Sequence, residues 1–320
     1  MIPSFRCRRA LPVRIACVSA LAASTVQASS LDRALRDAEG KGEFPKLTSV
    51  LVLEDGKTTY EGYFGGTDAE TLQDTRSATK SITSLAAGIA VAEGKIRSVS
   101  SPAFAFLADL KPFAHDGETK SAITVEDLLT MSSALDCDDN EDQSLGNEEN
   151  MYPKQVWARW AVDLPVKANY ARGAAGRGPF AYCTAGVFLL GQIIQRAAGM
   201  RIDRYVEERL FKPLGIARWQ LPTSPSGEVM TGGGLRLRSR DLAAVAQMLL
   251  DGGKWQGKQV VSESWVNAAL AVHRKANESQ DYGYLFWRRD YRTNNTRGMH
   301  QQTVRLLEEY VLPDLAFRPG

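Results

Sequence analysis

The sequence is poor in the residues on which many hydrolase and metal sites are built. Among its 320 residues are only three histidines, His115, His273 and His300, and none of them stands in a recognisable catalytic context. The G-x-S-x-G elbow, the H-E-x-x-H helix, the phosphate-binding P-loop and the C-x-x-C pair are all missing. The number of histidines does not by itself exclude a Ser-His-Asp triad. We expect no bound metal and no cofactor.

Long apolar runs are scarce as well, and the most marked one lies within the first 28 residues, which resemble an export signal. Its basic part holds Arg6, Arg8, Arg9 and Arg14, its apolar part spans 15–25, and Val26-Gln27-Ala28 fits a cleavage site. The apolar part is too short for a permanent membrane anchor. Cys17 stands in a poor context for lipid attachment. We expect residues 1–28 to be a signal peptide and the protein to be periplasmic or secreted, with no stable membrane anchor.

Removal of this segment changes both the cysteine count and the charge. It takes away Cys7 and Cys17 and leaves Cys137 and Cys183. In an oxidising compartment two remaining cysteines favour a single disulfide, and two buried thiols are the alternative. The cut also lowers the formal net charge by four, from +2 to −2. Without a basic cluster, this charge argues against nucleic acid as a partner. Nothing in the sequence indicates the oligomeric state.

The whole sequence is 44% hydrophobic. The chain that remains after cleavage can therefore bury a large core in one two-lobed unit. Apolar spacing and turn residues predict helices over 31–38, 77–94, 124–131, 184–199, 239–250 and 260–272. Strands are predicted over 47–54, 58–64 and 282–287, and Asp55-Gly56 between the first two is typical of a hairpin. Residues 304–311 fit either type.

The helix over 77–94 carries the central chemical feature, Ser77-Ala78-Thr79-Lys80. Residues three apart are neighbours on one helix face, so the Ser77 hydroxyl and the Lys80 amine should meet. A serine is a poor nucleophile until a base takes its proton, and a partly desolvated lysine can be that base. The helix N-terminus adds N–H groups where an oxyanion would form. The alternative is an N-cap serine beside a solvated lysine, because one S-x-x-K is expected by chance in such a chain.

An acidic loop over residues 136–149 could hold a cation. Asp136, Asp138 and Asn140 fit the first ligand positions of an EF-hand loop. Glu141 replaces the required glycine and Asn147 the bidentate glutamate, so the match fails. We expect a solvated loop, which would favour a cationic substrate group only if it lined the site.

Several motifs together resemble the serine β-lactamase and penicillin-binding-protein superfamily. They are, in order, Ser77-x-x-Lys80, the stretch 123–133, Tyr182-Cys183-Thr184-Ala185-Gly186, and Gly233-Gly234 ahead of Arg240-Asp241-Leu242. The resemblance covers about residues 45 to 290 and is closest to the class C-like branch, which includes esterases and 6-aminohexanoate-dimer hydrolases. It implies an α+β fold, with helices around an antiparallel sheet plus a helical lobe. The α/β lobe would comprise 29–97 and 228–320, and the helical lobe 98–227.

The same resemblance assigns roles to single residues. Ser77 would be the nucleophile, Lys80 its proton partner, and Tyr182 the tyrosine of the family's Tyr-x-Asn/Ser element. Thr184 and His300 would contact the substrate. A phenol serves as a base near neutral pH only if a cation such as Lys80 lowers its pKa from about 10. The alternative for Tyr182 is a tyrosine that is merely packed at a helix start.

Three departures from the family pattern bear on activity. Ala134 stands where the family usually has Gly, and Thr184 where it has Asn or Ser. The Gly-containing third motif is not found, since His300-Gln301-Gln302-Thr303 has about the right place but no glycine. Truncation or a frame error near residues 295–320 would explain atypical C-terminal strands; a natural but impaired protein would explain them equally.

The sequence therefore predicts an exported serine hydrolase that acts on a small ester or amide. It should resemble a carboxylesterase or amidase more than an efficient β-lactamase. A non-catalytic binding or cell-wall-associated protein, and a peptidoglycan DD-peptidase, are the alternatives.

Overall fold

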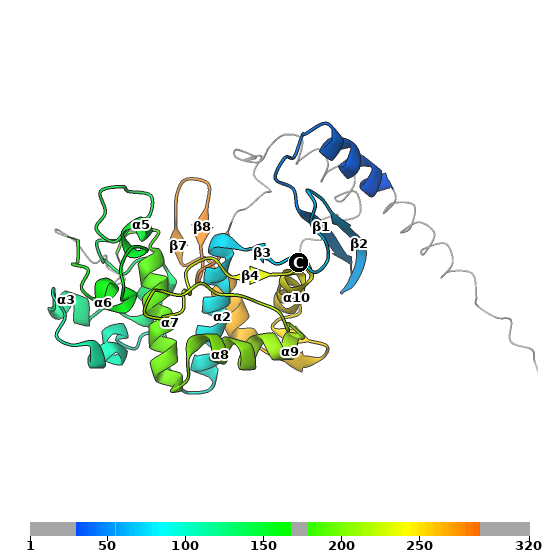
Figure 1. Ribbon diagram of the computed structural model, residues 1–320. Coiled ribbons are helices and arrows are strands. Elements are labelled where there is room, and N and C mark those ends of the chain that lie inside the picture. Colours follow the sequence, from blue (N-terminus) through cyan, green and yellow to red (C-terminus); the bar gives the residue numbers. More distant parts are fainter. Residues whose placement is uncertain (1–29, 55, 168–177, 289–320) are drawn as a thin grey trace, which may run out of the picture. The chain divides into compact units, whose positions relative to one another are not determined.

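The computed structural model describes residues 30–54, 56–167 and 178–288 (Figure 1). The chain divides into two compact units, one made of residues 1–68 and 296–320 and the other of residues 69–295. The expected signal peptide (1–28), His300 and the segment 304–311 lie outside the described residues.

The described part of the first unit is a helix and a hairpin. Residues 30–40 are helical, and strand β1 (Ser49–Glu54) pairs antiparallel with β2 (Lys57–Tyr63), from Ser49 opposite Tyr63 to Glu54 opposite Lys57. The hairpin predicted around residues 55 and 56 is confirmed. Tyr60 and Phe64 are buried against Leu31 and Leu35 of the helix. The Tyr60 hydroxyl donates to Asp32 (2.9 Å), so the one polar atom of that buried ring has a partner.

Two long helices form the centre of the second unit, α2 (Thr79–Ala92) and α7 (Thr184–Ala198). They pack against each other, and Figure 1 shows them side by side in cyan and green. Leu85 of α2 and Leu189 and Ile193 of α7 are fully buried in one core. Burying each such side chain stabilises the fold by about 1.5–3 kcal/mol. Lys80 and Thr184 lie in the first turns of these two helices, and Ser77 and Tyr182 shortly precede them, so the core holds the elements that carry the predicted site residues.

Shorter elements surround this pair. Helices η2 (Ala103–Leu110), α4 (Val125–Leu129), α6 (Trp157–Val162) and α8 (Ile202–Val206) pack on α7. Helix α11 (Glu263–Leu270) packs on α2, at a place where a Cβ on Gly88 would lie 2.3 Å from the Trp265 indole. Only a glycine allows this approach. The other helical segments are α3 (Glu118–Ser121), α5 (Glu148–Met151), η3 (Glu207–Phe211), α9 (Lys212–Leu214) and α10 (Ser239–Leu250).

The strands described in the second unit form small antiparallel sheets. Strand β3 (Gln73–Asp74) pairs with β4 (Arg236–Leu237), and β5 (Lys254–Trp255) pairs with β6 (Lys258–Gln259). A third sheet has three strands, in which β8 (Asp281–Tyr282) pairs with both β7 (Arg274–Lys275) and β9 (Trp287–Arg288). Helices and antiparallel pairs together make an α+β fold, as predicted. The division into lobes at residues 97/98 and 227/228 stays a prediction. Helices α2 and α7, which it assigns to different lobes, share one core.

Most predicted elements are found with small shifts of their ends. Thr124 and Asp127 form the capping box at the start of α4, and Gly199 ends α7 with a φ of 64°. The strand predicted over 282–287 is wrong, because the chain turns within it and makes two strands, β8 and β9. The Gly283 N–H donates to the Phe286 carbonyl (2.8 Å), and Leu285 has a φ of 62°. A continuous aromatic run conceals such a turn, since it contains one glycine and no other turn residue.

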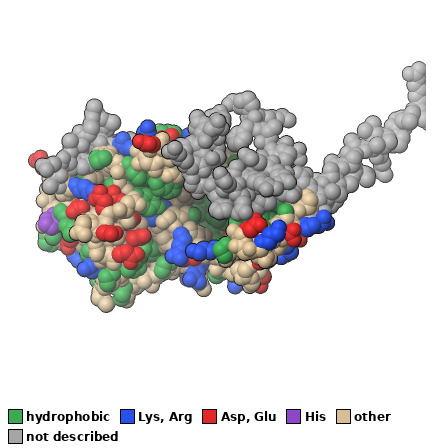
Figure 2. All heavy atoms as spheres, turned by 90° about the horizontal axis from the view of Figure 1, so that it is seen from above, with side chains coloured by type: hydrophobic (Ala, Val, Ile, Leu, Met, Phe, Trp, Pro, Cys, Tyr) green, Lys and Arg blue, Asp and Glu red, His purple; other side chains and the backbone are tan. Residues whose placement is uncertain are grey.

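Two surface properties complete the description. Of the helices in the described segments, none has both the length and the apolar character needed to cross a bilayer. Figure 2 shows acidic and basic side chains in separate small groups on the face that it draws, without a continuous basic surface among the described residues. The predicted absence of a nucleic-acid partner stays a prediction.

Candidate active site

Ser77 lies in η1 (Arg76–Ala78), a single 3₁₀ turn that leads directly into α2. Two threonines fix this turn. The Thr75 N–H and hydroxyl donate to the Leu235 carbonyl (2.8 and 2.9 Å), and the Thr79 hydroxyl donates to the Arg76 carbonyl (2.6 Å) and accepts the Leu235 N–H (3.0 Å). Ser77 itself is exposed. A rigid turn therefore presents an accessible hydroxyl.

The residue before Ser77 has an unusual backbone. Arg76 has a φ of 49°, in the left-handed region that side chains other than glycine enter at a cost of about 1–2 kcal/mol. Its N–H donates to the Asp74 carboxylate (2.8 Å), which helps to hold that conformation. Strained backbone of this kind gathers at functional sites, where the surrounding structure maintains it.

Lys80 is almost completely buried, with 1% of its surface exposed, directly beneath Ser77. Its amine donates to Ser77 Oγ (3.2 Å), Thr184 Oγ1 (2.8 Å) and the Gly232 carbonyl (2.6 Å). An ammonium has three donors, so these three acceptors satisfy it. A neutral amine would keep two of these bonds and turn a lone pair to the third position. The contact to Ser77 is the longest of the three.

Burial lowers the pKa of Lys80 to about 8, from an ordinary 10.5, because desolvation disfavours the charged amine. The carboxylates of Glu148 and Asp139 act in the opposite direction and limit the fall. A substantial neutral fraction is therefore present in mildly alkaline solution, where an ordinary lysine would be fully charged. This is the property that a general base needs.

Tyr182 lies just ahead of α7 and faces both Ser77 and Lys80. The Lys80 amine is 4.8 Å from the centre of its ring, and a hydrogen bond joins its oxygen to the Ser77 hydroxyl. Burial raises the pKa of Tyr182, and the hydrogen bonds from Ser77 and Trp287 only partly offset the rise. A role as a base near neutral pH would require a lowered pKa. The half-buried phenol is protonated at neutral pH, which suits a proton donor.

The acidic segment around residue 139 is not the solvated loop that its composition predicted. Asp139 is half-buried, and its carboxylate accepts the backbone N–H of Thr184 (2.8 Å) and of Glu148 (3.0 Å). Cys137 and Cys183, the pair for which a bridge was predicted, are joined by a disulfide with an S–S distance of 2.04 Å. The part of the segment next to Tyr182 is therefore built into the fold.

The structure brings Ser77, Lys80, Tyr182 and Thr184 together, within the second unit. It adds residues that sequence reasoning missed. Gly232 offers a carbonyl to Lys80, and a Cβ there would lie 2.6 Å from the Thr184 methyl group. The run Gly232-Gly233-Gly234 is a signal of close backbone approach that the sequence carries, but only Gly233-Gly234 was used, as part of the family resemblance.

The aromatic neighbours of Tyr182 had a weaker signal. Trp287 stacks on its ring, with centroids 5.6 Å apart, and Phe180 and Tyr282 meet Trp287 edge to face. Trp287 is 47% exposed. It therefore forms an apolar surface beside the reacting groups, although in sequence it is only one aromatic residue of a predicted strand.

The two histidines that the structure describes take no part. His115 is exposed, and His273 stacks on Tyr284 at 4.0 Å and contacts the Ala268 carbonyl. The described segments hold no group of three or more His, Cys, Asp or Glu side chains that could bind a metal ion.

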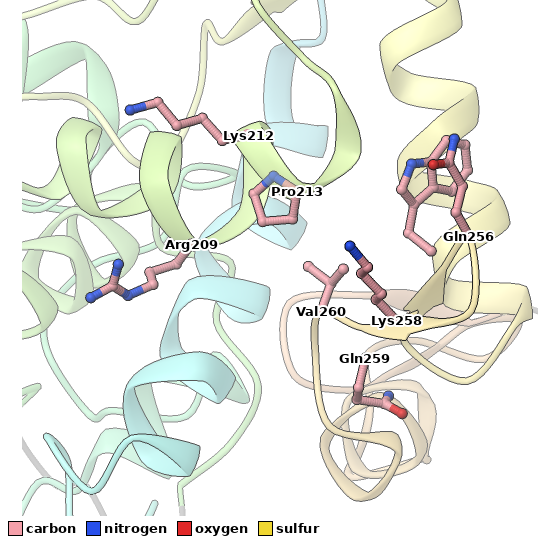
Figure 3. Close-up of a pocket in the computed structure, with 8 residues that line it drawn as sticks. Arg209, Lys212, Pro213, Gln256, Lys258, Gln259 and Val260 are labelled. Carbon is pink, nitrogen blue, oxygen red and sulfur yellow. The ribbon is translucent and has the colours of Figure 1, made fainter.

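A surface pocket of about 530 Å³ lies away from these residues. It is formed by Arg209, Lys212 and Pro213 on the helical side and by the β5–β6 hairpin, residues 255–260. In Figure 3, Lys258 points toward the gap, whereas Arg209 and Lys212 point away from the hairpin. Arg209 is already paired with Glu93 (2.7 Å). None of the candidate catalytic side chains lines this pocket.

Comparison with known proteins agrees with the resemblance seen in the motifs. The family model described as Beta-lactamase matches residues 31–309. The chain is 28% identical, over 253 residues, to the 6-aminohexanoate-dimer hydrolase of Paenarthrobacter ureafaciens; the match covers 77% of this chain and 62% of that protein. The chain thus spans less than two thirds of the length of this relative.

Solved structures show the same fold at low identity. EstCE1, a hydrolase with promiscuous acyltransferase activity, superimposes with a TM-score of 0.67 at 16% identity, and the match covers 87% of each chain. A penicillin-binding protein from Bacillus halodurans gives a TM-score of 0.59 at 18% identity, covering 78% of this chain and 82% of that one.

Proposed function

The chain belongs to the beta-lactamase family, and on that premise we propose that it is an exported serine hydrolase that cleaves an ester or amide through an acyl-enzyme on Ser77. The observation that carries the proposal is the hydrogen bonding of Lys80. A buried amine touches an exposed serine hydroxyl, and its other two partners are a hydroxyl and a carbonyl that hold it there.

The proposed reaction has two steps. Neutral Lys80 accepts the Ser77 proton while Ser77 Oγ bonds to the substrate carbonyl carbon, and the Ser77 N–H is one candidate donor to the oxyanion. Tyr182 protonates the departing amine or alkoxide and regains a proton within the Lys80–Tyr182 pair. Water then attacks the acyl-enzyme, its proton returns through the same pair to Ser77 Oγ, and the acid is released.

The raised pKa of Tyr182 and the lowered pKa of Lys80 support different roles for the two residues in proton transfer. At neutral pH the phenol carries a proton to give, and a fraction of the amine has a free lone pair to receive one. The arrangement supports Lys80 as the base and Tyr182 as the acid. This sharpens the expectation from the sequence, which treated them as one pair.

The substrate remains a proposal at the level of its class. The Paenarthrobacter relative is a hydrolase of 6-aminohexanoate dimer, an amide, and this supports an amidase or carboxylesterase more than an efficient β-lactamase. The export signal, the periplasmic or secreted location and the division into an α/β and a helical lobe belong to the same proposal. Thr184 would act here by positioning Lys80, and a substrate contact of His300 lies outside the described residues.

A second function rests on a specific observation. Because the Gly-containing third motif is not found in the sequence, the protein could bind an acyl donor and fail to release it. This binding protein would form the Ser77 adduct with no turnover.

The test is covalent labelling of the intact protein with a fluorophosphonate, followed by mass spectrometry. We expect one adduct, located on Ser77, and none in Ser77→Ala. Ser81→Ala is the matched control, since Ser81 lies one turn further along and donates to the Leu285 carbonyl (2.8 Å). No adduct on the wild type, or an adduct that survives Ser77→Ala, would overturn the proposal. Labelling without hydrolysis of simple esters and amides would select the binding protein.

A further inference from the structure

We propose that Asp139 is a positioning residue that acts on Lys80 through Thr184, forming a chain from carboxylate to hydroxyl to amine beneath Ser77. This inference rests on the proposed function, since it assigns a role within the same site. The known motifs of the chain contain Lys80 and Thr184 but leave Asp139 in a loop.

The direction of the hydrogen bonds makes Thr184 the link. A lysine amine donates to the Thr184 oxygen at 2.8 Å, so the hydroxyl proton must point elsewhere. The Thr184 hydroxyl and backbone N–H both bond to the Asp139 carboxylate. Asp139 therefore orients the hydroxyl so that its lone pair faces Lys80. An aspartate that holds the tautomer and orientation of a catalytic base acts in the same way in serine proteases.

Asp139 is itself held from several sides. Its N–H donates to the Tyr182 carbonyl (2.7 Å), its carboxylate also accepts the Glu148 N–H (3.0 Å), and its carbonyl accepts the Asn147 side chain (3.3 Å). The Cys137–Cys183 disulfide adds a covalent link between the same two segments. Residues 137–139 thus clamp the segment that carries the proton donor and the hydroxyl. Such fixed geometry matters, because a displacement of about 1 Å can slow a reaction by about 100-fold.

The carboxylate has a second effect, through its charge. The charged and titratable groups that act on Lys80 are Glu148 and Asp139, of which Glu148 has the larger influence, and both raise its pKa. Tyr182 faces Lys80 through its ring, and Tyr282 interacts with Tyr182 behind it. Glu148 is held by the Tyr152 hydroxyl (2.8 Å) and makes no described bond to Thr184. Asp139 alone combines the charge with the link through Thr184.

The experiment measures the rate of fluorophosphonate labelling of Ser77 as a function of pH in full-length Asp139→Asn. We expect the plateau rate to fall about tenfold, and the rising limb to move to lower pH by about one unit, because Lys80 loses a neighbouring negative charge. Asp138→Asn is the matched control. It removes the same charge one residue away, where the carboxylate bonds only to Asn140 in the described structure, and its profile should overlay that of the wild type.

The outcomes separate the two proposals. If the Asp139→Asn and Asp138→Asn profiles overlay while Ser77 is still labelled, the inference is overturned and the proposed function stands. If wild-type Ser77 is not labelled, the proposed function fails before any variant is compared. Should Asp139→Asn not fold, Thr184→Val and Thr184→Ser decide. Only the serine variant keeps the hydroxyl, so Thr184→Val should label about ten times more slowly, and equal rates would refute the inference.

Discussion

Two buried lysines, Lys80 and Lys120, have similar burial and similar pKa shifts but differ in one kind of contact. Each has 1% of its surface exposed, and desolvation lowers the pKa of each to about 8. Lys120 donates to the Val162 carbonyl (2.8 Å) and lies over the rings of Phe104 and Phe113, at 5.6 and 6.0 Å. Lys80 also donates to a carbonyl and lies over an aromatic ring.

The difference lies in what else each amine touches. Lys80 contacts two hydroxyls, one of them on the exposed Ser77, whereas among the described residues Lys120 contacts one carbonyl and two phenylalanine rings. A group with a shifted pKa can take part in proton transfer only when a group that exchanges protons lies beside it. A perturbed pKa therefore indicates a functional site only together with its neighbours.

The largest expected effect separates the two lysines by substitution with Met. Lys80→Met removes the base, and labelling of Ser77 should slow by about 1,000-fold. Lys120→Met removes an amine of equal burial and should leave the rate within about threefold. The measurement is the rate of adduct formation at pH 8 on variants shown to be folded by circular dichroism. Comparable slowing in both folded variants would show that burial, not the hydroxyl neighbours, distinguishes Lys80.

The second prediction concerns the stability that the Cys137–Cys183 disulfide gives to the fold. The disulfide joins residues 46 apart, and closing a loop of this length stabilises a protein by about 3–4 kcal/mol through the unfolded chain. We expect reduction to lower the free energy of unfolding by about 3 kcal/mol and to slow Ser77 labelling, because Tyr182 and Thr184 flank Cys183. Denaturant unfolding with and without reductant measures the first quantity. An unchanged midpoint in protein with two verified free thiols would contradict the prediction.

The contrast also shows what the sequence could predict. Ser77 and Lys80 follow from local geometry, since three residues on a helix bring them together whatever else the fold does. Tyr182 required the family motif, because nothing local ties it to residues a hundred positions earlier. Asp139 was missed because the acidic composition of residues 136–149 indicates a solvated loop. Its burial depends on the N–H of Thr184, 45 residues later, which no local pattern contains.

Ala134 is a second example of a residue that the sequence marks and only the structure explains. The motif comparison marks it as a departure from a usual glycine, but only the structure gives the reason. Its φ is 71°, in the region where glycine has no steric cost. The neighbouring hydrogen bond from the Lys167 N–H to the Ala134 carbonyl (2.9 Å) is kept despite the side chain. The chain therefore tolerates local strain near the buried part of the acidic segment.

The smallest effect tests the property that the two lysines share. Because the folded-state pKa of Lys120 lies near 8 and an unfolded lysine titrates near 10.5, the unfolded chain binds more protons between these values. The contribution of Lys120 to the free energy of unfolding should therefore rise with pH in that window, by at most about 1.4 kcal/mol per pH unit. Urea unfolding of Lys120→Met at pH 8, 9 and 10 should show a shallower rise than the wild type.

Lys95→Met is the matched control for that measurement, because Lys95 is exposed and its substitution should leave the slope unchanged. The prediction has a definite sign, since a lysine stabilised in its charged form would make stability fall with pH instead. A Lys120→Met slope equal to that of wild type would mean that Lys120 titrates normally. Of the two lysines, only Lys80 would then have a protonation state that burial changes. The lowered pKa would then distinguish the active-site lysine from the other buried lysine.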